Sequence, residues 1–276
     1  MQHIMYTMSK MEGIGKHSRL KLSKVISKSK EGLTPALVES VLSVNKQEAG
    51  RLLSRWEKAG WLQRIKRGFY ISIPVEASPG ELAIENPWAI VSNIFSPGYI
   101  AGFSAIKHWD LSEQLFETVV YFTTKKTNIL NPNYSGIKIH LKNIKSEKLF
   151  GTKTIWIGTV KVQVSDPSRT MIDFLDDPSL AGGMAIVKDF FNNYLDSKYK
   201  NIPLLIQYAE KFGNQTVFKR LGFLCEVTSA VDEDTLEKIR QRISKGYSNF
   251  DSIKSTTKMV SRWNLKVPIS WIKKND

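Results

Sequence analysis

The pattern of apolar and polar positions is clearest between residues 34 and 70, where it predicts two helices followed by two short strands. Thr34-Pro35 is typical of a helix start, because a threonine cap followed by proline pre-organises the first turn. After a short connection, Asn45 is followed three residues later by Glu48, which is the spacing of a capping box. A second helix therefore begins after Asn45, and Gly60 is expected to end it.

The second predicted helix has one apolar and one polar face. The apolar side chains, which recur at helical spacing, are Ala49, Leu52, Leu53, Trp56 and Ala59. The polar side chains are Lys46, Gln47, Arg51, Ser54, Arg55 and Lys58. Beyond Gly60, two short strands are joined by a basic stretch with Arg64, Lys66 and Arg67. Paired helices followed by a basic hairpin predict a winged helix-turn-helix domain.

This arrangement of cations is the one that DNA binding requires. Arginine and glutamine on an exposed helix reach base edges in the major groove, whereas lysines and hairpin arginines mostly neutralise phosphates. We therefore expect Gln47, Arg51 and Arg55 to contact bases, with Ser54 on the same face. The expected backbone contacts are Lys46, Lys58, Arg64, Lys66 and Arg67. Taken alone, the helix is more typical of an ordinary solvated surface helix, and only its combination with the first helix and the hairpin favours DNA.

A segment with proline and glycine at residues 74–80 indicates a boundary between two domains. Residues 1–19 are expected to be a disordered extension, and residues 20–73 the winged helix-turn-helix domain, which begins with a helix over 20–30. Residues 74–80 contain two prolines and a glycine, which is typical of a linker. Residues 81–276 then form a larger second domain.

The second domain changes from helical patterns to strand patterns and back. Helices are predicted at 87–95 and 103–109. Strands rich in β-branched and aromatic residues are predicted at 118–124, 137–141, 155–157 and 160–164. Further helices are predicted from the Asp166-Pro167 cap onward and at 184–195, 203–212, 215–229 and 232–245. Strands followed by a run of helices indicate the α+β fold class rather than a doubly wound sheet.

Charge and cysteine content narrow the function classes. The chain of 276 residues has 40 lysines and arginines against 26 acids, and its net charge of +14 favours polyanionic partners. Residues 121–170 hold nine basic against two acidic residues, so a second basic surface is expected. No apolar run is long enough for a membrane span and no signal peptide is recognisable, which favours a cytoplasmic protein. Cys225 is the only cysteine, in an apolar context that indicates the core.

The order of several short runs adds a resemblance to these patterns. The runs are Arg67-Gly68-Phe69-Tyr70, the segment from Tyr99 to Trp109, Thr123-Thr124-Lys125, the run from Val164 to Asp173 and Lys219-Arg220-Leu221-Gly222. In this order after a basic hairpin, they resemble the AbiE-type (AbiEi) antitoxin family of abortive-infection transcriptional regulators. The resemblance covers roughly residues 20–245.

The resemblance implies a two-part protein without enzymatic activity. The N-terminal domain would bind inverted repeats upstream of its own operon as two copies, with bending of the DNA expected, and repress transcription. The second domain would counteract a cognate toxin that resembles a nucleotidyltransferase. Direct binding of that toxin stays open, and no cofactor is implied.

A metal-dependent nuclease recruited by the same domain is the alternative function. Asp173, Asp176 and Asp177 are close enough in sequence to hold a metal, but capping or salt bridging is the more frequent role of such residues. The acids at 232–234 stand where a helix start favours negative charge. No metal-ligand spacing joins His3, His17, His108 and His140, and Gly182-Gly183 lacks the rest of a phosphate loop.

Aromatic residues near the second basic region have two interpretations. Trp156, Trp263, Trp271, Tyr121 and Tyr134 would stack on single-stranded nucleic acid if they were exposed. Tryptophan and tyrosine at strand spacing are more often part of the core. The tail over residues 262–271 is either a returning strand or an exposed peptide.

Overall fold

The computed structural model describes residues 15–29, 32–73, 87–114, 117–134, 136–157, 160–251 and 256–272. The chain divides into two compact units. The N-terminal unit comprises the chain up to Phe95 together with residues 132–138 and 156–162. The C-terminal unit comprises residues 96–131, 139–155 and 163–276. The predicted linker, residues 74–80, lies outside the described residues.

Three helices and a hairpin open the N-terminal unit. They are α1 (Lys16–Lys28), α2 (Pro35–Leu42), α3 (Lys46–Lys58), β1 (Leu62–Lys66) and β2 (Phe69–Ser72), with β1 and β2 antiparallel. Both predicted caps are present, because Thr34 Oγ1 accepts from the Leu37 amide at 3.2 Å and Asn45 Oδ1 from the Glu48 amide at 2.9 Å. The shared apolar core contains Leu22, Val25, Leu33, Val38, Leu52, Leu53, Trp56, Leu62 and Tyr70.

Helix α1 begins earlier than the pattern indicated. The predicted start at residue 20 is wrong, and the predicted disordered extension is wrong for residues 16–19, which are helical. The Trp56 indole in α3 donates to Ser18 Oγ at 3.0 Å, and this contact holds the first turn of α1. Residues 1–14 of the predicted extension lie outside the described part of the chain.

A mixed sheet follows, in the strand order β5-β6-β4-β3-β8-β7. Its strands are β3 (Gly98–Ile100), β4 (Val119–Thr123), β5 (Asn133–Tyr134), β6 (Ile137–Asn143), β7 (Thr152–Ile157) and β8 (Val160–Ser165). Strand β4 runs parallel to β6, and β3 runs parallel to β8 but antiparallel to β4. Helices α4 (Pro87–Phe95) and α5 (Gly102–His108) flank β3 in sequence.

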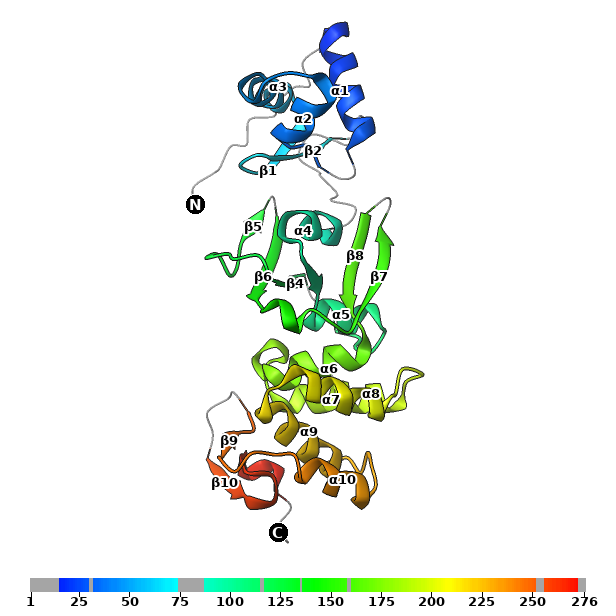
Figure 1. The fold of residues 1–276 in the computed structure, drawn as a ribbon, viewed down its shortest axis with the longest axis vertical. Helices are drawn as coiled ribbons and strands as arrows, with labels where there is room; N and C mark the ends of the chain where they lie inside the picture. Colours follow the sequence, from blue (N-terminus) through cyan, green and yellow to red (C-terminus); the bar gives the residue numbers. More distant parts are fainter. Residues whose placement is uncertain are drawn as a thin grey trace, which may run out of the picture. The chain divides into compact units, whose positions relative to one another are not determined.

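Helix α6 (Pro167–Asp176) belongs to the helical part of the C-terminal unit, where it lies beside α7 and α8 (Figure 1). Every residue from Pro167 to Leu175 is buried, and α6 contacts α5, α7, α8 and α9. The other helices are α7 (Met184–Asp196), α8 (Ile202–Phe212), α9 (Gln215–Val227) and α10 (Glu233–Arg240), with short 3-10 turns at Ser146–Lys148, Pro178–Ala181, Ser261–Trp263 and Ile269–Trp271. The helix predicted over 232–245 therefore ends five residues early, at Arg240.

The last residues form a small three-stranded sheet. Strands β9 (Ser248–Asn249), β10 (Thr257–Val260) and β11 (Leu265–Pro268) stand in the order β10-β11-β9. The tail over residues 262–271 is thus a returning strand with buried Leu265 and Val267. The mixed α and β composition agrees with the predicted class. In the parts of the chain that the structure describes, no helix has the length and apolarity needed to cross a bilayer.

Candidate nucleic-acid interface and the buried polar network

The two faces of α3 are separated as the sequence pattern predicts. Ala49, Leu52, Leu53 and Trp56 are buried against the core of the N-terminal unit. On the opposite side the exposed side chains are Lys46, Gln47, Arg51, Arg55 and Lys58. Ser54 is half-buried. Packing thus fixes the rotation of α3 about its axis, and four cations and a glutamine point to solvent.

The hairpin presents further cations. Arg64 and Arg67 are exposed, whereas Lys66 is half-buried. Gly68 has a φ of 77°, a left-handed conformation that glycine adopts without strain, and it lets the chain turn directly after Arg67. The hairpin therefore carries two of the three predicted basic residues in full exposure.

Arg51 has a carboxylate nearby, but the pair is loose. The Arg51 guanidinium lies 4.0 Å from the Glu48 carboxylate, and the two side chains are 66% and 41% exposed. Exposed pairs of this kind contribute at most about 1 kcal/mol. Exchanging Glu48 for another anionic partner of Arg51 would therefore cost little free energy.

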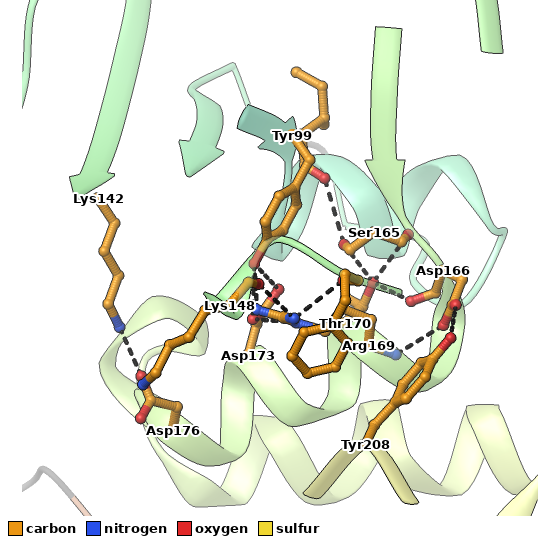
Figure 2. A network of polar contacts seen from close by, with 12 residues as sticks. Tyr99, Lys142, Lys148, Ser165, Asp166, Arg169, Thr170, Asp173, Asp176 and Tyr208 are labelled. Atoms are coloured by element: carbon orange, nitrogen blue, oxygen red, sulfur yellow. Dashed lines mark hydrogen bonds and ion pairs between the residues drawn. The ribbon is translucent and has the colours of Figure 1, made fainter. Parts of the chain in front are cut away.

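The C-terminal unit contains a buried polar network centred on Arg169 of α6 (Figure 2). Its Nε donates to Asp173 Oδ1 at 3.0 Å, and its Nη2 donates to the Tyr99 hydroxyl at 2.6 Å. Its Nη1 donates to the carbonyls of Lys148 and Phe150 at 2.8 and 3.1 Å. The side chains of Arg169 and Asp173 are 0% and 1% exposed, so the ion pair is fully removed from solvent.

Burial controls the protonation of this network. Desolvation raises the pKa of the Tyr99 phenol well above its usual value, and the neighbouring Asp173 carboxylate raises it further. Burial also raises the pKa of Asp173, which the Arg169 guanidinium and the Tyr99 hydroxyl oppose. Tyr99 consequently stays a hydrogen-bond donor, and its hydroxyl lies 3.2 Å from Asp173 Oδ1. Through the hydrogen bonds of Tyr99 with Arg169 and Asp173, the network joins strand β3 to helix α6.

Asp166 extends the network to α8. Its Oδ1 accepts from the Arg169 amide at 2.8 Å and so caps α6, as the sequence predicts. Its Oδ2 accepts from the Tyr208 hydroxyl at 2.9 Å (Figure 2). Desolvation and this hydrogen bond raise the pKa of Tyr208 to about 12.

The three aspartates considered for a metal are paired with cations instead. Asp173 pairs with Arg169, and Lys142 Nζ lies 3.1 Å from a carboxylate oxygen of both Asp176 and Asp177. Among the described residues no three His, Cys, Asp or Glu side chains are grouped as a metal ion would need. The predicted salt-bridging role of these aspartates is confirmed.

The runs that carry the family resemblance have structural roles. Ser104 accepts from the Val120 amide at 3.0 Å, which fixes α5 to β4. Arg220 Nη1 donates to the carbonyls of Leu175 and Asp176 at the end of α6. Gly222 lies against the buried Trp263 ring, with no room for a side chain.

The remaining candidate residues divide between confirmed and corrected interpretations. Asp232 caps α10 by accepting from the Thr235 amide at 2.9 Å, and Cys225 is buried. Tyr121 and Trp263 are core residues, as expected. The core interpretation is wrong for Trp156, whose side chain on the edge strand β7 is 63% exposed. Lys161 Nζ lies 5.1 Å from the centre of the Trp156 ring.

Sequence reasoning missed Tyr99, Arg169 and Tyr208 as members of one network. The four-residue spacing of Arg169 and Asp173 is a signal for their pairing on one helix. The other partners come from β3, from the connection before β7 and from α8, which no local pattern brings together.

No protein-family model matches the chain, and no curated protein matches it. Among solved structures, the chain is similar to the crystal structure of the RV2827C protein from Mycobacterium tuberculosis. The two agree with a TM-score of 0.63 over 94% of this chain and 93% of that chain, at 13% sequence identity. At this identity the likeness establishes a shared fold for nearly the whole chain.

Proposed function

We propose that this protein is a sequence-specific DNA-binding autorepressor and an antitoxin of an AbiE-type abortive-infection system, without enzymatic activity of its own. In this proposal α1, α2, α3 and the hairpin β1–β2 form a winged helix-turn-helix domain, in which α3 is the recognition helix. The observation that carries it is the exposed face of α3 with Gln47, Arg51 and Arg55, beside the exposed Arg64 and Arg67 of the hairpin.

The chemistry of these side chains supports binding to duplex DNA. A helix whose apolar side is packed presents its polar side as a fixed surface, and the major groove admits such a helix. Arg51 and Arg55 have the paired donors that match the acceptors of guanine, and Gln47 has the donor and acceptor that match adenine. Lys46, Lys58, Arg64 and Arg67 would neutralise phosphates. The half-buried Ser54 and Lys66 are secondary contacts in this proposal.

The antitoxin role rests on the resemblance of the runs between Arg67 and Gly222 to the AbiE-type family. In this proposal the C-terminal unit counteracts a nucleotidyltransferase-like toxin encoded in the same operon, and the N-terminal domain represses that operon from inverted repeats. Coupling repression to the antidote in one chain would tie the expression of both proteins to the amount of antitoxin.

Fluorescence anisotropy on two duplexes tests the DNA-binding part. One duplex is the region upstream of the protein's own gene and the other is a scramble of it, each measured across a salt series. We expect binding to the upstream duplex about a thousandfold tighter than to the scramble. The Arg51→Ala/Arg55→Ala double variant should lose this preference. Its matched control is Lys238→Ala/Lys245→Ala, which removes two exposed charges from the C-terminal unit.

Equal and steeply salt-dependent affinity for both duplexes would contradict the proposal, since the cations would then track only phosphate. Co-expression with the cognate nucleotidyltransferase-like toxin that the proposal expects in the same operon tests the antitoxin part. Growth should be restored by the full chain and also by the Arg51→Ala/Arg55→Ala variant. Failure of both to restore growth would contradict the antitoxin role.

A further inference from the structure

A second group of cations lies in the C-terminal unit, at the connection between the 3-10 turn Ser146–Lys148 and β7. Lys148 ends the 3-10 turn, Lys153 is in the first part of β7, and Lys211 comes from the last turn of α8. Phe150 and Tyr208 lie among them with half-exposed rings that pack edge to face at 5.5 Å between centroids. We call these five residues the lysine surface.

Cations lie close to the aromatic rings of Phe150 and Phe212 in this region. The buried Arg169 guanidinium lies 4.3 Å from the centre of the Phe150 ring and 5.1 Å from that of Phe212. Lys211 Nζ lies 4.5 Å from the Phe150 centre, and Lys148 Nζ lies 3.8 Å from the Phe212 centre. Each ring thus contacts two cations, which places three positive charges within a few side chains of one another.

The backbone between Lys148 and Lys153 is held in place by contacts with α6 and α8. Arg169 binds the carbonyls of Lys148 and Phe150 from below. Gly151, with a φ of 67°, packs so closely that a Cβ there would lie 2.9 Å from both Arg169 Cβ and Tyr208 Cε2. The lysines are therefore presented by a backbone that is already ordered, which lowers the entropic cost of binding a ligand.

The charges of this region are not balanced within the protein. Asp173 pairs with Arg169, and burial raises the pKa of Asp166, an effect that the nearby Lys153 partly opposes. In the described part of the chain, no salt bridge joins Lys148, Lys153 or Lys211 to a carboxylate. Like charges held close together repel, and an anionic ligand would relieve that repulsion.

We propose that the lysine surface binds a strand of unpaired RNA. Binding sites for unpaired strands combine cations that follow the backbone with aromatic side chains that meet the bases, and this surface combines both. Leu149, which is 37% exposed, adds an apolar contact for a base. We commit to RNA because its unpaired loops and ends present bases that stack on aromatic side chains. The lysine surface contains no residue of α3, so a test of RNA binding is independent of the proposed operator binding.

Anisotropy of the full chain with a labelled twelve-nucleotide oligo(U) tests this proposal. The measurement uses the Arg51→Ala/Arg55→Ala background, which removes the two arginines proposed to contact bases of duplex DNA. It compares oligo(U) with oligo(dT) and with a twelve-base-pair duplex. The test variant adds Lys148→Gln, Lys153→Gln and Lys211→Gln. The matched control adds Lys198→Gln, Lys200→Gln and Lys245→Gln, which removes three exposed charges elsewhere in the same unit.

We expect oligo(U) to bind, the duplex to bind at least tenfold more weakly, and the test variant to lose at least tenfold in affinity for oligo(U). The slope of log K against log salt should become shallower by about 2, because three phosphate contacts on a single strand contribute roughly 0.7 each. The control should stay within about twofold of the background, since its charges do not line the site.

Several outcomes overturn the proposal. They are no binding of oligo(U), equal loss in the control variant, unchanged affinity of the test variant for oligo(U), or tighter binding of the duplex or of oligo(dT) than of oligo(U). Because Lys148 packs on Phe212, a Lys153→Gln/Lys211→Gln variant that leaves Lys148 in place keeps the test valid if the triple variant misfolds. Its expected salt slope is shallower by about 1.4.

Discussion

The buried pair of Arg169 and Asp173 gives the sharpest prediction about stability. Asp173→Asn keeps the shape of the side chain but removes the negative charge that faces the guanidinium at 3.0 Å. Arg169 would remain buried at 0% exposure with a full positive charge. Removing one partner of a buried ion pair costs about 3–5 kcal/mol, because the other charge is left uncompensated. We expect Asp173→Asn to lose that much unfolding free energy.

The other hydrogen bonds of Arg169 keep this loss of unfolding free energy from growing larger. Its donors to Tyr99 and to the carbonyls of Lys148 and Phe150 do not depend on the charge of Asp173 and stay in place. The transition would fall by roughly 6–20 °C, since each kcal/mol shifts the midpoint of a domain of this size by about 2–4 °C. Thermal and urea unfolding followed by circular dichroism would measure it.

A double-mutant cycle separates the pair from its surroundings. The cycle comprises Asp173→Asn, Arg169→Gln and both changes together. The double variant should be less destabilised than the sum of the singles, because it leaves no unpaired charge. Lys145→Gln provides the control: its pair with Glu147 spans 3.6 Å and is 79% and 71% exposed, so the loss should stay below about 1 kcal/mol. A loss below about 1 kcal/mol for Asp173→Asn, or additive singles, would refute the reasoning.

Three further predictions follow from single contacts. Asn45→Ala removes the cap of α3 and should cost about 1 kcal/mol of stability in the N-terminal unit, with weaker binding to operator DNA, whereas Asn45→Asp should retain most of both. The pKa of Tyr208 is raised to about 12 in the folded protein, so its contribution to stability is complete below about pH 10 and is lost as the pH rises from 10 to 12. Tyr208→Phe should flatten this part of the pH profile of unfolding, and an unchanged profile would contradict the hydrogen bond to Asp166. Gly222→Ala places a methyl group against the Trp263 ring and should cost about 1–3 kcal/mol, measurable as a lower urea midpoint; an unchanged midpoint would mean that the ring moves freely.

The elements that the sequence predicted well are those with local determinants. The caps at Thr34, Asn45 and Asp166 each bond to an amide three residues ahead, so the same short pattern that predicts the cap also forms it. The amphipathic pattern of α3 likewise fixed which side chains are buried. These features need no knowledge of the rest of the chain, which is why the proposed interface could be identified residue by residue.

The features that the sequence missed depend on distant partners. Strand β3 has only three residues, too few for an alternating pattern, and it is a strand because β4 and β8 pair with it. Trp156 has the strand spacing of a core residue and is nevertheless exposed, because burial depends on which elements cover that face of the sheet and the local pattern does not contain this information. Arg169 meets carbonyls about twenty residues before it in sequence, at Lys148 and Phe150. Such contacts follow from topology, which the mixed strand order made hard to predict.

The resemblance to the AbiE-type family and the proposed binding surfaces rest on different residues. The run from Val164 to Asp173 is almost entirely buried, and its members cap α6, pair with one another or fill the core. Side chains of that kind stabilise the fold and are not available to a partner, so they do not identify one. Binding to a partner depends on exposed residues, which are free to differ between proteins with the same core. In the two proposals, the operator and the RNA are recognised by the exposed side chains of α3 and of the lysine surface. Substitutions there should therefore change binding while leaving the midpoint of unfolding in place.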